Sequence, residues 1–334
     1  MRFAIIALAA AVAASRGFGQ TTRVFRLTQN ESTQQMDVIA DILRGTGDIP
    51  QVFIDEQVSS IAVEGTPGQV AMADWLLHQL DLPQNGQYTG VHQYRAAGGD
   101  DVLRVLFASH ASTPDELQEI ASAVQVLAHF QKGFRGYDTL KALVVRGTNQ
   151  QVSLAAWVVD QLDDPGNAAD TSPHDYKVAD DDVARVFHPT HARSLEQLQE
   201  IATIIRSVGD VSWVIPCNEL HAIVMRNKAE RVALAAWLVS EFDTPVSRLN
   251  VKHGGAAPPE FRLSDDPENL VRVYYLGGSG SASAEAYQKV IDQVRRAART
   301  YRSFVYAALG ALVVRGSARQ LATAEKVIEQ SSAQ

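Results

Sequence analysis

The chain contains 334 residues, of which 46% are hydrophobic, and it carries a formal net charge of −8 at pH 7. This acidic balance argues against nucleic acid or an anionic lipid surface as a general partner, because both repel negative charge. Cys217 is the only cysteine, so no internal disulfide can form and stability has to come from apolar cores.

The first 19 residues have the pattern of an export signal. Arg2 provides a charged start, an apolar stretch runs from Phe3 to Ala14, and small residues follow. We place cleavage after Gly19, with cleavage after Ala14 as the alternative. The apolar stretch is shorter than the roughly 20 residues that a membrane-spanning helix needs. We therefore expect an exported, periplasmic protein that does not span a membrane and, without a cysteine near the cleavage site, has no lipid anchor.

One pattern occurs four times along the chain: a β-type run ends in Gly or Asn and leads into a helix that closes, in the first three copies, on Asp-x-Pro. The copies start 82, 80 and 89 residues apart, at Ile61, Leu143, Ile223 and Leu312. A second repeated strand starts at Val24, Val105, Val186 and Val273. Such spacings are too long for a solenoid repeat and fit small domains, so whole modules have been duplicated.

Each module is expected to be α+β, with the order β-α-β-β-α and a small sheet carrying two helices on one face. The first helices are predicted at Gln34–Arg44, Pro114–Ala128, Leu195–Ser207 and Ala284–Arg299. A hairpin follows, and its return strand runs into Gly65, Gly147, Asn227 or Gly316. Glycine and asparagine at this place predict a left-handed backbone turn.

The domain boundaries follow from these repeats and from linker composition. We expect a signal peptide at 1–19, module 1 at 20–84, module 2 at 88–165, module 3 at 173–245, a linker at 246–258 and module 4 at 259–334. Modules 2 to 4 carry an additional extended segment ahead of the repeated unit, starting at His92, His174 and Pro259.

Each additional segment ends in acidic residues, at Asp100–Asp101, Asp180–Asp182 and Asp265–Asp266. Paired carboxylates suit calcium, but the alternating ligand spacing of a dedicated calcium loop is missing. We favour turns and helix caps, which aspartate forms by accepting hydrogen bonds from nearby backbone amides.

Other reactive residues do not form a constellation. His110 and His191 occupy equivalent places in modules 2 and 3, and His188 lies near the second, but further metal ligands are missing. Cys217 and His221 occur together in one module only, which argues against a thiol nucleophile. We therefore expect no catalytic, metal-binding or cofactor-binding residue and no enzyme activity.

The repeated motifs resemble the periplasmic N-terminal, KH-like domains of bacterial secretins. The similarity is best in module 1, where Val24 to Leu27, Asp55, Gly65, Asp81 and Pro83 match, and weakest in module 4, where Ile328 and Glu329 replace Leu-Asp. The resemblance implies non-catalytic modules that stack edge to edge and contact secretion components. We expect no channel domain, because nothing after Gln330 could form long amphipathic strands.

The last helix of modules 1 to 3 carries an apolar pair on the side away from its own core. At about 100° per residue, Val70, Ala73 and Leu77 cluster on one side of the first of these helices and the tryptophan lies nearly opposite. The candidate interaction residues are Met72, Trp75, Leu154, Trp157, Leu234 and Trp237. Thr323 and Lys326 replace the pair in module 4, as capping of an array predicts.

Three kinds of neighbour could cover these tryptophans: the next module or a linker, the additional segment of the same module, or a separate partner. We favour the first. The function expected from these patterns is a periplasmic scaffold or adaptor whose partners are proteins, either secretion or pilus components or further copies of itself. The alternative is an envelope protein that binds peptidoglycan or another polysaccharide.

Overall fold

The computed structural model describes residues 19–30, 32–84, 86, 88, 92–95, 101–166, 174–192, 194–245, 257–263, 269–276 and 284–332. The chain divides into two compact units, Met1–Pro165 and Gly166–Gln334, and each contains two α+β modules. The predicted fold class is therefore confirmed. The expected signal sequence up to Phe18 and most of the expected linker lie outside the described residues. Within the described part of the chain, no helix is long and apolar enough to cross a membrane.

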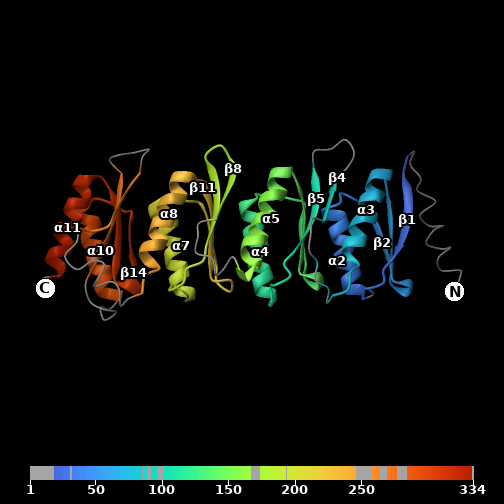
Figure 1. Ribbon diagram of the computed structural model, residues 1–334, viewed down its shortest axis with the longest axis horizontal. Helices are drawn as coiled ribbons and strands as arrows, with labels where there is room; N and C mark the ends of the chain where they lie inside the picture. The colour runs from blue at the N-terminus through green and yellow to red at the C-terminus, as the bar shows by residue number, and fades with distance from the viewer. Residues whose placement is uncertain are drawn as a thin grey trace. The chain divides into compact units, whose positions relative to one another are not determined.

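Unit 1 contains modules 1 and 2 (Figure 1). Module 1 is formed by β1 (Thr21–Arg26), α2 (Thr33–Gly45), β2 (Gln51–Asp55), β3 (Ser60–Gly65) and α3 (Pro67–Leu80), with the antiparallel strand order β1-β3-β2. Module 2 is formed by β4 (His92–Arg95), β5 (Val102–Phe107), α4 (Pro114–Leu127), β6 (Phe134–Tyr137), β7 (Ala142–Gly147) and α5 (Asn149–Asp163), with the order β4-β5-β7-β6. The additional segment of module 2 thus supplies a fourth strand, β4, at one edge of its sheet.

Unit 2 repeats this plan with two four-stranded modules. Module 3 is formed by β8 (His174–Ala179), β9 (Asp182–Phe187), α7 (Leu195–Gly209), β10 (Trp213–Cys217), β11 (Ala222–Lys228) and α8 (Ala229–Phe242). Module 4 is formed by β12 (Glu260–Arg262), β13 (Leu270–Tyr275), α10 (Ala284–Ala298), β14 (Ser303–Tyr306), β15 (Ala311–Gly316) and α11 (Ala318–Ser332). In each unit a sheet, its two helices, the next sheet and its two helices follow one another as layers (Figure 1).

Five helices begin directly after a residue that caps them. Ser32, Thr66, Thr113, Thr148 and Ser194 each accept a hydrogen bond from the third residue of their helix, whose side chain reaches back to the cap. These reciprocal bonds form capping boxes, each of which satisfies backbone groups that a helix start leaves open. A capping residue of this kind contributes about 1 kcal/mol to stability.

The predicted left-handed turn at Gly65, Gly147, Asn227 and Gly316 is wrong. The left-handed residues of the four hairpins lie earlier, at Ser59, Lys141, His221 and Gly310. Glycine follows the return strand for a different reason: a Cβ at Gly65, Gly147 or Gly316 would lie 2.8 Å from the side-chain oxygen of the glutamine four residues later. Module 3 has Arg231 instead of that glutamine, and there Asn227 replaces glycine.

The aspartate of the repeated helix ending connects two parts of its own module. Asp243 accepts hydrogen bonds from the backbone N–H groups of Thr190, His191 and Ala192, at 2.8, 2.6 and 3.0 Å. Asp81 and Asp163 accept the equivalent bonds in modules 1 and 2. The end of the last helix is thereby joined to the loop that follows the first repeated strand. Burial alone would raise the pKa of Asp243, but these hydrogen bonds outweigh it and hold the pKa below its usual value.

Candidate protein-interaction surface

The sheets of modules 2 and 4 are buried on both faces. Successive side chains of a strand point to opposite sides of the sheet, and here each side contributes to a different core. In β13, Leu270 and Tyr274 join the core beneath α10 and α11, whereas Val271 and Val273 join the core of module 3. In module 2, Leu103 and Val105 likewise belong to the core of module 1. We call the contacts between the module 2 sheet and module 1 the module 1–2 interface, and those between the module 4 sheet and module 3 the module 3–4 interface. They explain why the return strands read as continuous apolar runs.

A buried hydrogen bond lies at the centre of the module 1–2 interface. The Tyr137 hydroxyl, at the end of β6, donates to Asn30 Oδ1 at 2.6 Å. Asn30 in turn donates from Nδ2 to the carbonyl of Leu80 at 2.7 Å. Tyr137 is 1% exposed and Asn30 is fully buried. Burial raises the pKa of Tyr137 to about 12, so the hydroxyl remains a donor well above neutral pH.

An arginine of the return strand connects to the preceding module in both units. In unit 1, Arg146 donates to Thr46 O at 3.3 Å and pairs with Asp48 at 3.0 Å. In unit 2, Arg315 donates from Nη1 to the carbonyl of Val208 at 2.6 Å and pairs with Asp210 at 2.9 Å. Both aspartates have positive φ just after the first helix of their module.

These arginines use both kinds of acceptor that a helix end offers. The last carbonyls of a helix have no partner within it, and a cationic side chain at that end also complements the helix dipole. Arg315 is 2% exposed, and burial lowers the pKa of its guanidinium. A planar guanidinium can contact a carbonyl and a carboxylate together, which makes this a specific contact between modules.

Further contacts in the module 3–4 interface involve aromatic and acidic residues. The rings of Phe242 and Tyr306 have centroids 4.8 Å apart. The Tyr275 hydroxyl contacts Glu241 Oε2 at 3.1 Å. Glu200 accepts a hydrogen bond from the backbone N–H of Ala307 at 3.2 Å, and burial raises the pKa of this carboxyl group. Both polar and apolar contacts therefore fix module 4 against module 3.

The candidate tryptophans of modules 1 and 3 lie against the first strand of the following module. The ring of Trp75 is 5.7 Å from that of Tyr94 in β4, and the ring of Trp237 is 5.7 Å from that of Phe261 in β12. Their companions Met72 and Leu234 are buried.

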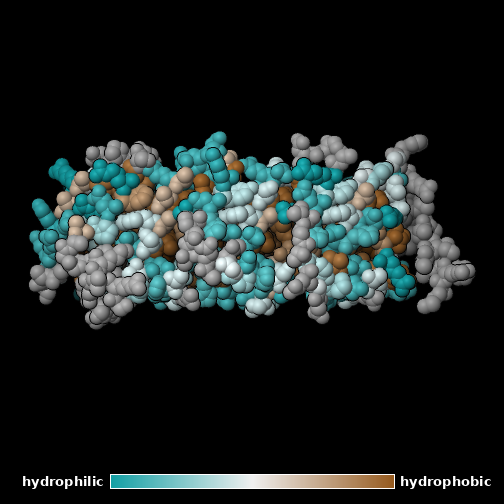
Figure 2. All heavy atoms as spheres, viewed as in Figure 1, coloured by the Kyte–Doolittle hydropathy of each residue, from teal (hydrophilic) through white to brown (hydrophobic). Residues whose placement is uncertain are grey.

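In module 2, Leu154 is buried and Trp157 is half-buried on α5. At the end of the array, Thr323 is half-buried and Lys326 is exposed. On the visible face, hydrophobic residues reach the surface mainly in narrow strips between hydrophilic ones (Figure 2).

The acidic turns and the equivalent histidines have structural partners. Asp101 pairs with Arg146 at 3.4 Å, and Asp182 pairs with Arg226 at 2.7 Å. His110 lies 3.2 Å from Asp163, and His191 lies 3.7 Å from Asp243. These two aspartates also accept the hydrogen bonds from the backbone of the loop that follows the first repeated strand. Asp100 and Asp265–Asp266 lie outside the described residues.

Within the described ranges, no group of three His, Cys, Asp or Glu side chains is arranged to hold a metal ion. Cys217 is fully buried in the last position of β10. A buried cysteine of this kind packs as a small apolar side chain.

The residues that sequence reasoning missed are Asn30, Tyr137 and the two arginines with their aspartates. A signal for them was present in the repeat. Tyrosine occurs at the hairpin position of modules 2 and 4 only, and an aspartate follows the first helix at the matching place of modules 1 and 3 only. Comparing alternate modules, instead of all four together, would have pointed to paired modules.

No protein-family model matches this chain, and no curated protein does. Solved structures of secretins show similarity to this chain. Aeromonas hydrophila ExeD has 14% identity over 68% of this chain and 42% of its own, with a TM-score of 0.17. The ETEC pilotin–secretin complex AspS–GspD has 13% identity over 69% and 39%, with a TM-score of 0.18. The Escherichia coli K12 type II secretin GspD has 11% identity over 68% and 40%, with a TM-score of 0.16. The chain thus spans less than half the length of these secretins.

Proposed function

We propose that this chain is a non-catalytic scaffold or adaptor that binds proteins through the outer face of the module 1 sheet. One observation carries the proposal. The sheets of modules 2 and 4 each receive the helices of the preceding module, whereas the same face of module 1 leaves Val24 46% and Phe53 42% exposed. In modules 2 and 4 the residues equivalent to Val24 are buried, with Val105 1% exposed and Val273 fully buried.

The partner expected on this face is a pair of helices from another protein. The helices of module 4 suit it poorly, because Thr323 and Lys326 stand where modules 1 and 3 have an apolar pair. Head-to-tail pairing of identical chains is therefore disfavoured. Burying one large apolar side chain contributes about 1.5–3 kcal/mol, so a few such residues are enough for a specific contact.

Two features favour protein over polysaccharide as the ligand. Sugar-binding sites present aromatic rings to solvent for stacking, but the rings of Trp75 and Trp237 already lie against aromatic rings of the next module. The repeated residues also serve contacts between modules and not a common polar site. The sequence resemblance to secretin N-terminal domains, through Asp55, Gly65 and Asp81, supports a periplasmic place beside a secretion or pilus assembly.

The proposal is tested by binding measurements with the mature chain. We expect it to bind purified periplasmic domains of a secretin or pilus protein, and Phe53→Asp to weaken this binding at least tenfold. Tyr301→Asp is the matched control, because Tyr301 is an exposed aromatic residue of module 4. Sedimentation with isolated peptidoglycan and no binding to those proteins would establish the alternative function. Light scattering on the purified chain would identify self-association.

A further inference from the structure

Four equivalent arginines precede the repeated valines, at Arg23, Arg104, Arg185 and Arg272. Three of them meet a carboxylate of their own module. Arg23 pairs with Asp74 at 3.1 Å, Arg185 with Asp175 at 2.6 Å, and Arg272 with Glu260 and Glu325 at 2.7 and 3.2 Å.

Arg104 of module 2 is the exception. Two positions supply the carboxylate in the other modules. In module 2 the helix position is Ala156, where modules 1 and 4 have Asp74 and Glu325. The strand position is Gln93, which lies opposite Arg104 in the sheet as Asp175 lies opposite Arg185. Among the residues that the structure describes, no carboxylate pairs with Arg104, and its Nε is buried without a hydrogen-bond acceptor. A buried donor left in this state destabilises the fold, because neither water nor a protein group satisfies it.

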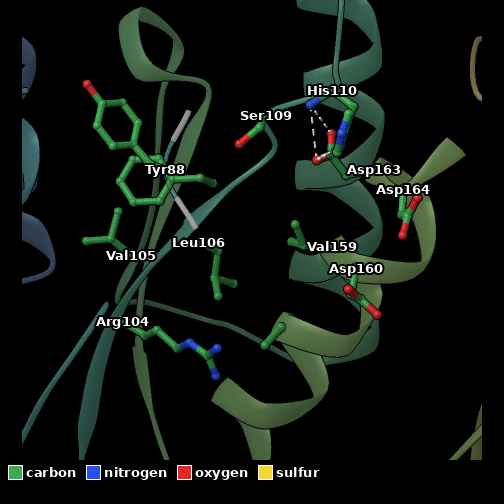
Figure 3. A pocket seen from close by; sticks show the side chains of 12 residues that line it. Tyr88, Arg104, Val105, Leu106, Ser109, His110, Val159, Asp160, Asp163 and Asp164 are labelled. Carbon is green, nitrogen blue, oxygen red and sulfur yellow. Dashed lines mark hydrogen bonds and ion pairs between the residues drawn. The ribbon is translucent and has the colours of Figure 1, made fainter. Parts of the chain in front are cut away.

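Arg104 also lines a cavity. Ala156, which stands where modules 1 and 4 have an acidic residue, lines the same cavity. The cavity lies between β5 and α5 and has a volume of about 360 Å³. In Figure 3 the Arg104 side chain extends from the strand towards the helix that carries Val159 and Asp160. Leu106 and Ala156 add apolar surface. This volume lies within the range of pockets for small ligands, roughly 300–1,000 Å³.

We propose that this cavity binds a carboxylate ligand, with the Arg104 guanidinium as its anchor. The ligand carboxylate takes the place of the side chain that modules 1, 3 and 4 supply internally. A guanidinium and a carboxylate can form two parallel hydrogen bonds, and the Arg104 side chain is part of the cavity wall. The apolar wall selects a carboxylate attached to a small apolar group, as at the C-terminus of a peptide.

The charge around the cavity restricts the ligand further. Asp160, Asp163 and Asp164 also line it. Three carboxylates near one guanidinium repel a dianion such as phosphate more strongly than a single carboxylate. The charge around the cavity therefore disfavours polyanionic ligands more strongly than a monoanion.

Calorimetric titration of the mature chain tests this assignment. The probes are N-acetyl-alanyl-alanine, its C-terminal amide, butyrate and inorganic phosphate. We expect the acetylated dipeptide acid to bind at least tenfold more tightly than the amide or phosphate. Butyrate separates the two sources of a carboxylate: weaker binding than the dipeptide indicates a peptide ligand, and equal binding indicates a small free acid.

Two variants and one control identify the anchor. Arg104→Gln should reduce the affinity for the dipeptide at least tenfold. Ala156→Asp should do the same while Arg104 is retained, because it recreates the internal pair of module 1, and its thermal unfolding should show an intact fold. Arg23→Gln removes the equivalent arginine of module 1 and should leave binding unchanged. Equal affinity for acid and amide, tighter binding of phosphate, or unchanged affinity in both module 2 variants overturns the proposal.

Discussion

Tyr137 and Asn30 form a hydrogen bond of 2.6 Å between the hairpin of module 2 and the first loop of module 1. Because Asn30 also contacts the carbonyl at the end of α3, one buried amide joins three segments from two modules. Such a group is costly when one partner is lost, since water cannot replace it. The bond therefore specifies how the sheet of module 2 sits on the helices of module 1.

The variant Tyr137→Phe removes the hydroxyl and leaves Asn30 Oδ1 without this donor. We expect unit 1 to lose about 1–3 kcal/mol of its free energy of unfolding. Hydrogen exchange read by mass spectrometry checks this, because it reports unit 1 and unit 2 separately. Tyr301→Phe, at a side chain that is 86% exposed, is the control and should change nothing. Unchanged exchange in both variants would show that the bond contributes nothing.

The same residue predicts a loss of stability at high pH. Burial raises the pKa of Tyr137 from 10.0 to about 12. Its contribution is complete below pH 10, where tyrosine is neutral in both states, and is lost between pH 10 and about 12 as the unfolded chain ionises first. A shift of this size corresponds to roughly 2–3 kcal/mol. Hydrogen exchange of unit 1 between pH 9 and 12, compared with Tyr137→Phe, measures this loss, and the variant should show a smaller one.

Local patterns in the sequence predicted the fold class well. The first helix of module 1, expected at Gln34–Arg44, spans Thr33–Gly45, because a capping serine and helical spacing are both local signals. Return strands such as Ala142–Gly147 were equally visible as short apolar runs. These features depend on residues close together in the chain.

Contacts between modules could not be predicted in the same way. The partners Tyr137 and Asn30 are 107 residues apart, and neither residue type specifies the other. The prediction of a left-handed turn at Gly65 was wrong because glycine is required there by the nearby Gln69 side chain and not by the backbone angle. The difference between Arg104 and its three equivalents lies in side-chain ion pairs, which the repeated Arg-Val sequence does not specify.

Low pH should weaken module 3 through Asp243. The pKa of this carboxyl group is held below its usual value of 3.8, so its contribution is complete above that value and is lost as the pH falls through the lower folded-state pKa. Asp243→Asn removes the charged acceptor from three backbone N–H groups and should cost about 1–3 kcal/mol at pH 7.

Acid titration of the same variant supplies the second readout. Hydrogen exchange of peptides covering Thr190–Ala192 should become less dependent on pH below 4 in Asp243→Asn than in the unmodified chain. Asp41→Asn serves as control, because Asp41 is 70% exposed in a surface pair with Arg44 and such pairs contribute little. An equal acid response in all three proteins would contradict a stabilising role for the Asp243 charge.

The glycine before α3 can be tested by a double-mutant cycle. A Cβ at Gly65 would lie 2.8 Å from Gln69 Oε1, which accepts a hydrogen bond from the Thr66 backbone at 2.9 Å. Gly65→Ala should therefore displace the glutamine and cost about 1 kcal/mol, the value of a helix cap. In the Gln69→Ala background the same change should be neutral or stabilising, because alanine restricts the unfolded chain more than glycine does. Denaturant unfolding of the four proteins, with unit 1 followed by hydrogen exchange, provides the comparison. If the two substitutions change the free energy of unfolding additively, the proposed contact between Gly65 and Gln69 is contradicted.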